Sequence, residues 1–139
     1  MLLLDTHSWI WVVEGQPRRV GRRTRQLVAR AETQYQVRVS PISIFEVMAL
    51  HTAGRVEFAA RADHWLAAAL SGPGIRLAEL TPSVAVDAGA IPRVALADPI
   101  DRVLVATARQ LGAVFVTGDE LILDYAKRTG TLRVHDVRS

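Results

Sequence analysis

Short apolar runs alternate with longer amphipathic stretches along the 139 residues of this chain. The short runs are typical of buried strands, whereas the longer stretches repeat apolar residues three and four positions apart, as helices do. We expect strands at residues 1–4, 37–40, 75–80, 113–117 and 131–134. We expect helices at residues 6–13, 19–34, 41–53, 57–70, 82–89, 99–112 and 119–127.

The order of these elements predicts an α/β fold. Strands that alternate with helices indicate a parallel sheet with helices on its faces. Thr81-Pro82 and Asp98-Pro99 each place a capping side chain before a proline at the first helical position, which supports two of the helix starts. The length suits one domain over residues 1–139.

Composition excludes several classes of site and location. Because cysteine is absent, disulfides and thiolate zinc sites are excluded, and the four histidines are too scattered for a histidine-rich zinc site. The opening MLLLD is too short for a signal peptide, and no apolar run approaches the ~20 residues of a membrane span. We therefore expect a cytoplasmic protein without membrane contact.

Acidic residues stand where an α/β sheet binds ligands. Asp5 follows the first strand and Asp119 follows the strand at 113–117, and ligands bind at the carboxyl ends of such strands. Asp98 and Asp101 begin one helix, and Glu46 interrupts the apolar stretch ISIFEVMAL.

Each of these acids also has a structural interpretation. Asp5, Asp98 and Asp119 could be helix N-caps, and Asp101 could stabilise the positive end of its helix dipole. Glu46 could lie on the polar edge of its helix. A charged group among apolar neighbours nevertheless needs a partner if it is buried.

Taken together, the acids predict a metal site. Two carboxylates within ~5 Å repel by ~3 kcal/mol at an effective dielectric constant of about 20, so a cluster must protonate, stay hydrated or bind cations. Oxygen ligands favour Mg²⁺ or Mn²⁺, which can activate water against a phosphodiester. The net charge of +3 fits such a substrate.

A run of arginines follows the first helix. These residues are Arg18, Arg19, Arg22, Arg23 and Arg25, with Arg30 beyond them. Clustered arginines suit RNA phosphates or carboxylates on a partner, but a solvated helix face explains them equally well. His7 and Trp9 lie near Asp5 and could touch substrate, although Trp9 and Trp11 also suit packing.

Four segments together resemble the motifs of PIN domains in the form found in VapC toxins. They are LLLDTHSWIW, ISIFEVMAL, DPIDRVLVATARQLG and VFVTGDELI, in the expected order over essentially the whole chain. The resemblance implies a three-layer α/β/α sandwich with a parallel central sheet. It implies an endoribonuclease that uses Mg²⁺ or Mn²⁺, the toxin of a type II toxin–antitoxin pair.

The resemblance also assigns residues and partners. Asp5, Glu46, Asp101 and Asp119 match the family's acidic residues. Asp98 is a further possible metal ligand, and Thr6 and Thr117 match polar positions that support the pocket. VapC toxins usually form homodimers and are neutralised by a VapB antitoxin, whose C-terminal tail covers the active site. The antitoxin usually contacts DNA, so this chain is expected to meet DNA only indirectly.

Two other classes are weighed against this interpretation. A haloacid-dehalogenase phosphatase needs DxD after the first strand, where this chain has Asp5-Thr6-His7. A receiver domain needs paired acids after its first strand and a lysine late in the chain, and the only lysine here is Lys127, in an expected helix. No GxxxxGK[ST] phosphate loop is present. The other alternative is a catalytically idle module of PIN type that binds RNA or protein.

Overall fold

A five-stranded parallel sheet forms the centre of the molecule, which a computed structural model describes over residues 1–139. The strand order is β3-β2-β1-β4-β5, and every neighbouring pair is parallel. The strands are β1 (Leu2–Leu4), β2 (Val37–Val39), β3 (Ile75–Leu77), β4 (Val114–Thr117) and β5 (Val134–Asp136). The chain extends the sheet outward from β1 to β3 and then returns to pair β4 with the other side of β1.

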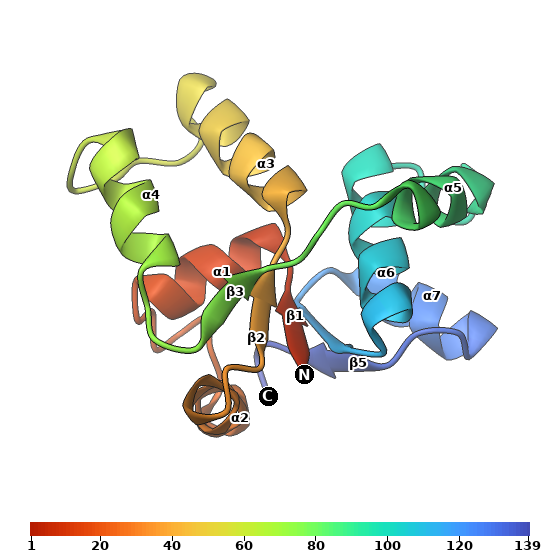
Figure 1. Cartoon of the computed structure of the whole chain (residues 1–139), viewed down its shortest axis with the longest axis horizontal. Coiled ribbons are helices and arrows are strands. Elements are labelled where there is room, and N and C mark those ends of the chain that lie inside the picture. The colour runs from red at the N-terminus through yellow and green to blue at the C-terminus, as the bar shows by residue number, and fades with distance from the viewer.

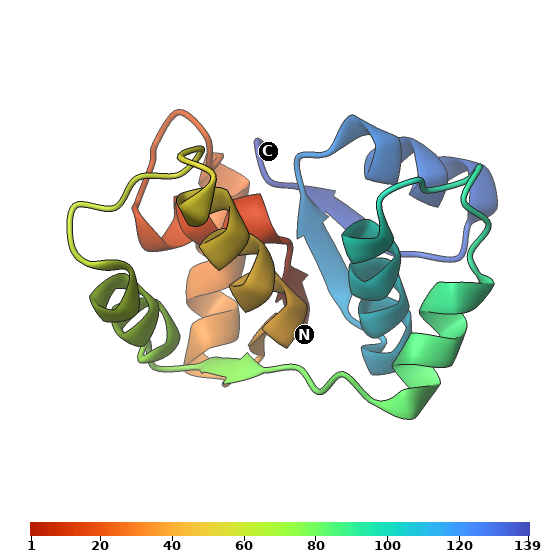
Figure 2. The same ribbon diagram turned by 90° about the horizontal axis from the view of Figure 1, so that it is seen from above.

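Helices cover both faces of this sheet. They are α1 (Thr6–Val13), α2 (Arg22–Thr33), α3 (Pro41–Thr52), α4 (Ala62–Leu70), α5 (Pro82–Ala90), α6 (Pro99–Leu111) and α7 (Glu120–Thr129). Figures 1 and 2 show α1, α2 and α4 on one side of the central strands and α5, α6 and α7 on the other. The expected three-layer α/β/α sandwich is therefore confirmed.

Alternation along the central strands divides the core in two. Leu2 and Leu4 of β1 belong to one buried cluster, which also contains residues of α1, α2, α3 and α4. Leu3 between them belongs to a second cluster, together with residues of α6 and α7. Because successive side chains of a strand point to opposite faces, the fully apolar strand LLL serves both layers.

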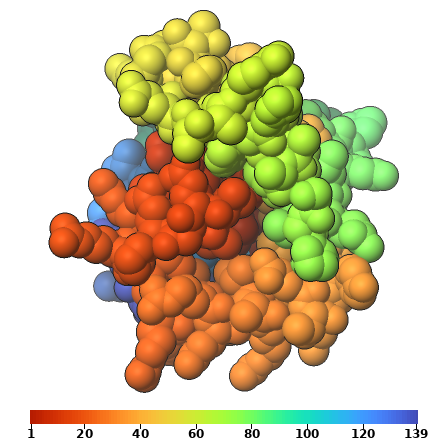
Figure 3. All heavy atoms as spheres, turned by 90° about the vertical axis from the view of Figure 1, so that its left-hand side faces the viewer, coloured from red at the N-terminus to blue at the C-terminus, as the bar shows by residue number.

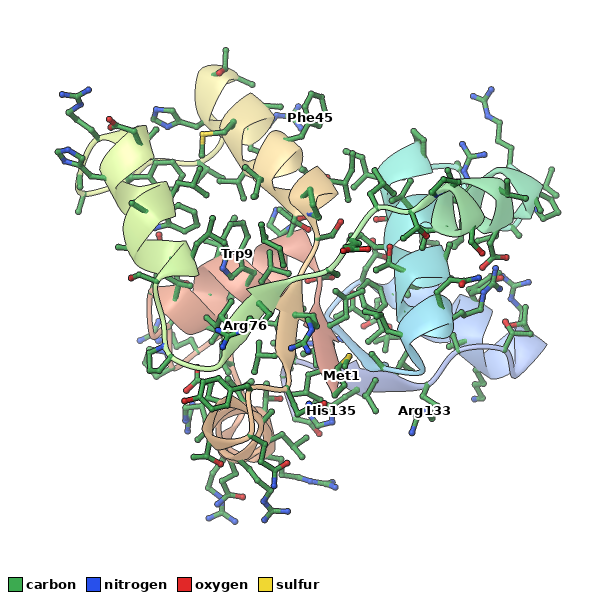
Figure 4. All side chains as sticks on the ribbon, in the orientation of Figure 1. Met1, Trp9, Phe45, Arg76, Arg133 and His135 are labelled. Carbon is green, nitrogen blue, oxygen red and sulfur yellow. The ribbon has the colours of Figure 1, made fainter.

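A stack of aromatic rings joins α1, α3 and α4. Trp9 of α1 is fully buried and meets Trp65 of α4 edge to face, with 5.3 Å between ring centroids; Figure 4 shows Trp9 between these two helices. Phe58 stacks on Trp65 at 4.5 Å, and His51 stacks on Phe58 at 4.9 Å. The stack thus holds the segment between α3 and α4 against the rest of the core.

This stack explains one error in the expected helices. The helix expected at 57–70 begins only at Ala62, because Phe58 is held in the stack and Arg61 is the extended N-cap. The helix expected at 19–34 likewise begins at Arg22, after a turn closed by hydrogen bonds from Arg19 and Val20 to Gln16. Residues 19–21 and 57–61 therefore lie outside a helix.

The last strand lies further along the chain than the sequence predicts. It was expected at 131–134, but β5 is Val134–Asp136, and Val134 pairs with Phe115. Leu132 is nonetheless buried in the core, which explains why its segment has the apolar character of a strand. β3 is also shorter than the expected 75–80, ending at Leu77. None of the helices has the length and apolar character needed to cross a membrane.

The start of β3 supplies a test of the packing. Gly74 has φ +88°, and a Cβ there would lie 2.1 Å from the carbonyl oxygen of Glu32, whereas Gly54 has φ +74° and no atom within 4 Å of such a Cβ. We expect Gly54→Ala to lower the free energy of unfolding by about 1–2 kcal/mol, the cost of the left-handed backbone. Gly74→Ala adds a collision with the backbone of α2, so its loss should exceed about 3 kcal/mol. Urea denaturation measures both, and equal losses would show that α2 and β3 separate without cost.

Candidate active site

A cavity of about 630 Å³ opens at the carboxyl ends of the two central strands, β1 and β4. This is the point at which the order of the strands reverses, where α/β sheets bind ligands. All five acids singled out in the sequence line the cavity: Asp5, Glu46, Asp98, Asp101 and Asp119. The structure therefore brings together carboxylates from four separate segments of the chain.

Asp5 lies deepest, with 8% of its surface exposed. Its Oδ1 accepts a hydrogen bond from the backbone N–H of Ser8 at 2.8 Å, so it also serves as the N-cap of α1. Burial raises the pKa of Asp5 above its usual value, although the hydrogen bonds from Thr117 and Ser8 act in the opposite direction. The carboxyl is therefore held firmly and in an environment that disfavours its charge.

Thr117 connects the two strand ends. Its hydroxyl donates to Oδ2 of Asp5 at 2.5 Å and accepts from the backbone N–H of Asp119 at 3.0 Å. Thr117 is fully buried, so no water competes for its hydroxyl. This one side chain therefore fixes Asp5 and the start of α7 relative to each other.

The other two caps leave an oxygen free. Oδ1 of Asp98 accepts from the N–H of Ile100, and Oδ1 of Asp119 accepts from the N–H of Leu121, each at 2.8 Å. The capping interpretation is thus correct for both, yet neither Oδ2 is hydrogen-bonded within the protein. A capped carboxylate can still offer its second oxygen to the pocket.

Glu46 belongs to the pocket and is only partly buried. Its helix α3 is tied to α1 by a buried hydrogen bond, in which the hydroxyl of Thr6 donates to that of Ser43 at 3.0 Å. Ser43 lies one turn before Glu46, so this bond helps to set the position of the glutamate. Thr6, expected to support the pocket, lines it and bonds through its hydroxyl to a serine.

Repulsion between the acids is visible at Asp101. Its pKa is raised to about 7, first by burial and then by Asp98, Asp119, Glu46 and Asp5. Near neutral pH the metal-free site therefore holds Asp101 partly protonated.

The donor set fits a hard divalent cation. Five carboxylates supply oxygen ligands only, and an ion among them would remove the repulsion that raises the pKa of Asp101. As the side chains stand, no three acidic or histidine side chains are grouped closely enough to hold one ion. The chemistry of the residues therefore favours a cation that draws them together.

The rim of the pocket contains residues that the sequence motifs do not include. His7, Trp11, Glu14 and Gln16 come from α1 and the turn after it, and Arg55, Val56 and Glu57 come from the segment between α3 and α4. On the left-hand side of the molecule, Figure 3 shows the α1 segment (red) between the yellow to yellow-green residues that run from α3 to α4 and the orange residues of α2. Arg55 follows the end of α3, and the late start of α4 leaves Glu57 outside a helix as well.

The arginine cluster does not act as one group. Arg19 lines the pocket, and its guanidinium carbon lies 5.3 Å from the centroid of the Trp11 ring. Arg25 donates a hydrogen bond to the carbonyl of Val20. The others, Arg18, Arg22, Arg23 and Arg30, are exposed and make no ion pair.

Comparison with known proteins agrees with the motifs. The model of the PIN domain family matches residues 2–128 of this chain. Ribonuclease VapC22 of Mycobacterium tuberculosis is 33% identical over 118 residues, which cover 85% of this chain and 86% of that protein.

Solved structures share the fold at lower identity. A chain of the VapBC2 complex of Rickettsia felis, bound to a DNA fragment from its promoter, superposes with a TM-score of 0.68 at 14% identity, covering 96% of each chain. A chain of DNA-bound VapBC from Salmonella typhimurium gives 0.65 at 21% identity, covering 97% of this chain and 96% of that one. The chain therefore belongs to the PIN-domain family and is a relative of the VapC ribonucleases.

Proposed function

We propose that this chain, as a single PIN domain over residues 1–139, is a metal-dependent endoribonuclease and the toxin of a toxin–antitoxin pair. The convergence of five carboxylates at the carboxyl ends of β1 and β4, inside a chain of net charge +3, carries this proposal. A basic protein with an acidic pocket can attract a polyanion and hold cations where that polyanion is cut. The 33% identity to a ribonuclease over most of both chains supports the same conclusion.

Asp5, Asp101 and Asp119, with Glu46 and Asp98, are the residues that would hold Mg²⁺ or Mn²⁺. When bound, such an ion lowers the pKa of a coordinated water and stabilises charge on a phosphodiester. The chain itself supplies orientation: Thr117 holds Asp5 and the N–H of Asp119, and the bond between Thr6 and Ser43 positions Glu46. Asp101, with its pKa raised to about 7, can hold a proton on its carboxylate in the metal-free chain.

Partners follow from the same family membership. We propose a VapB-type antitoxin, RNA as the substrate, a homodimer in solution and contact with DNA only through the antitoxin. Some of the exposed arginines of the cluster are proposed to contact the RNA backbone or acidic residues of the antitoxin; the candidates are Arg18, Arg19, Arg22, Arg23 and Arg25.

Catalysis is tested by removing one charge from the pocket. Asp101→Asn should reduce the rate of RNA cleavage in Mg²⁺ or Mn²⁺ by at least about 100-fold, because a metal ligand contributes several kcal/mol of transition-state stabilisation. Asp124→Asn is the control, since Asp124 is exposed on α7 and pairs with Arg128 outside the pocket. Full activity of Asp101→Asn, or no cleavage by the unmodified chain, would favour the idle binding module.

The raised pKa of Asp101 gives a second test, on stability. Between its unfolded value near 4 and about 7, the folded state binds more protons than the unfolded state, so stability falls as pH rises. Without metal, Asp101→Asn should therefore be more stable than the unmodified chain above pH 7, by roughly 1–2 kcal/mol after allowance for solvent screening. The difference should close below pH 4.

Urea denaturation in EDTA at a series of pH values measures this difference. Saturating Mg²⁺ should then stabilise the unmodified chain more than Asp101→Asn, since the ion binds the folded state and Asp101 would be one of its ligands. A difference independent of both pH and Mg²⁺ would show that Asp101 does not experience the repulsion described here.

Control by the antitoxin is the third test. A guanidinium from its C-terminal segment can replace the charge of the cation near Asp5, Asp101 and Asp119 without its Lewis acidity, and its planar fork suits two carboxylate oxygens. We expect the complex to be inactive, and excess Mg²⁺ to restore only part of the activity because apolar contacts of the same segment remain. A complex that leaves the pocket open and keeps full cleavage activity would contradict this mechanism.

A further inference from the structure

Arg19 is a cation at the pocket with no protein partner for its charge. Its guanidinium lies over the ring of Trp11, 5.3 Å from the centroid, and forms no ion pair and no side-chain hydrogen bond. The nearest acid in sequence, Glu14, instead accepts a hydrogen bond from Gln16 at 2.7 Å. The N–H groups of Arg19 are therefore free to bind an anion.

Trp11 is fixed beside the acids. A Cβ on Gly118 would lie 3.6 Å from Cζ3 of Trp11, so the indole packs against the backbone that leads from Thr117 to Asp119. The imidazole of His7 lies 5.8 Å from the same ring, tilted by 48°. Both rings and Arg19 line the cavity that holds the five carboxylates. Trp11 and Arg19 thus lie together beside the backbone that leads to Asp119.

Trp11 packs against the edge of the first core cluster, but this packing covers only part of its ring. The neighbouring Trp9 is fully buried and packs on Trp65, whereas Trp11 is only partly buried and Arg19 is exposed. An arginine stacked on an aromatic ring presents one flat face and a row of donors. Such a surface suits a nucleobase on the flat face and a phosphate at the donors.

We propose that Trp11 and Arg19 form a subsite for the nucleotide next to the scissile phosphate. The base stacks on the guanidinium, which lies between it and the indole, and the adjoining phosphate accepts hydrogen bonds from Arg19. A base can stack there only when it is unpaired and out of a helix, so the substrate class is single-stranded or looped RNA. The subsite rests on the proposed ribonuclease function and adds the means by which the chain holds RNA.

The volume of the site agrees with this occupant. A cavity of about 630 Å³ lies in the range of pockets that enclose an organic ligand, and it extends from the acids to Arg19. Metal ions and one phosphate would occupy only the part of the cavity at the carboxyl ends of β1 and β4, which leaves room for a nucleotide near Arg19.

Binding measurements test the subsite. A short RNA that the unmodified chain cleaves is titrated against Asp101→Asn protein, into which Trp11→Leu, Trp11→Phe or Arg19→Gln is introduced. Arg93→Gln is the matched control, because Arg93 is exposed and outside the pocket. Trp11→Leu removes the ring that holds the guanidinium in place under the base, so it should weaken binding by at most about 5-fold to 150-fold, the range for one lost base stack, and Trp11→Phe by less. Arg19→Gln should weaken binding and reduce the slope of log K against log salt by about 0.7, one phosphate contact on a single strand.

RNAs that lack a single base distinguish base stacking from attraction between the protein and the RNA backbone. A series of RNAs is prepared, each lacking the base of one nucleotide. Protein that retains Trp11 should bind more weakly only to the RNA whose missing base lies beside the cleaved bond. For that RNA, Trp11→Leu should cause no further loss of binding. With cleavage-competent protein, Trp11→Leu should raise KM more than it lowers kcat. Circular dichroism checks the fold, and Arg19→Gln carries the test if Trp11→Leu fails to fold.

Several outcomes would overturn the subsite. Unchanged RNA binding by Arg19→Gln and Trp11→Leu would do so, and so would losses that persist at every abasic position. Weaker antitoxin binding with unchanged RNA binding would assign the pair to the antitoxin. These results leave the ribonuclease itself intact, whereas an unmodified chain that cleaves no RNA would refute the proposed function and the subsite together.

Discussion

The hydroxyl of Thr117 lies between the carboxylate of Asp5 and the backbone N–H of Asp119, and the acidic pocket is organised around that contact. The register of the sheet makes it possible, because Leu4 pairs with Val116 and the next residues of both strands then face each other. A buried hydroxyl that bonds on both sides cannot shift without leaving polar groups unpaired. Two helices, α1 and α7, begin from this one junction.

Helix capping and metal binding are compatible in this site. Asp5, Asp98 and Asp119 each use one carboxylate oxygen to cap a helix, and the positive ends of α1, α6 and α7 therefore converge on the pocket. Those dipoles offset part of the negative charge. They do not offset all of it, since the neighbouring acids add to burial in raising the pKa of Asp101 to about 7. A bound cation would relieve the repulsion that remains between the carboxylates.

The floor and the rim of the pocket differ in charge. Only carboxylates supply charge to the floor at the strand ends, whereas the rim has both signs, with Arg19 and Arg55 beside Glu14 and Glu57. A polyanion can bind the two arginines, and it needs a cation to approach the acids of the floor. The aromatic stack shapes one border of the pocket, because Phe58 packs on Trp65 and Glu57 therefore lies outside a helix.

The sequence by itself determined the alternation of strands and helices and the placement of Asp5 and Asp119 at one edge of the sheet, because periodicity, caps and parallel strand direction are local properties. It also carried the motifs that indicate the family. The ISIFEVMAL motif grouped Glu46 with these acids only through the family resemblance. Tertiary structure alone decided that Arg55 reaches the rim, and that Arg19 lies over Trp11 while Arg25 turns back to the main chain. These side chains are placed by packing between segments far apart in the chain, and no local pattern records which face of a helix or turn will meet which neighbour.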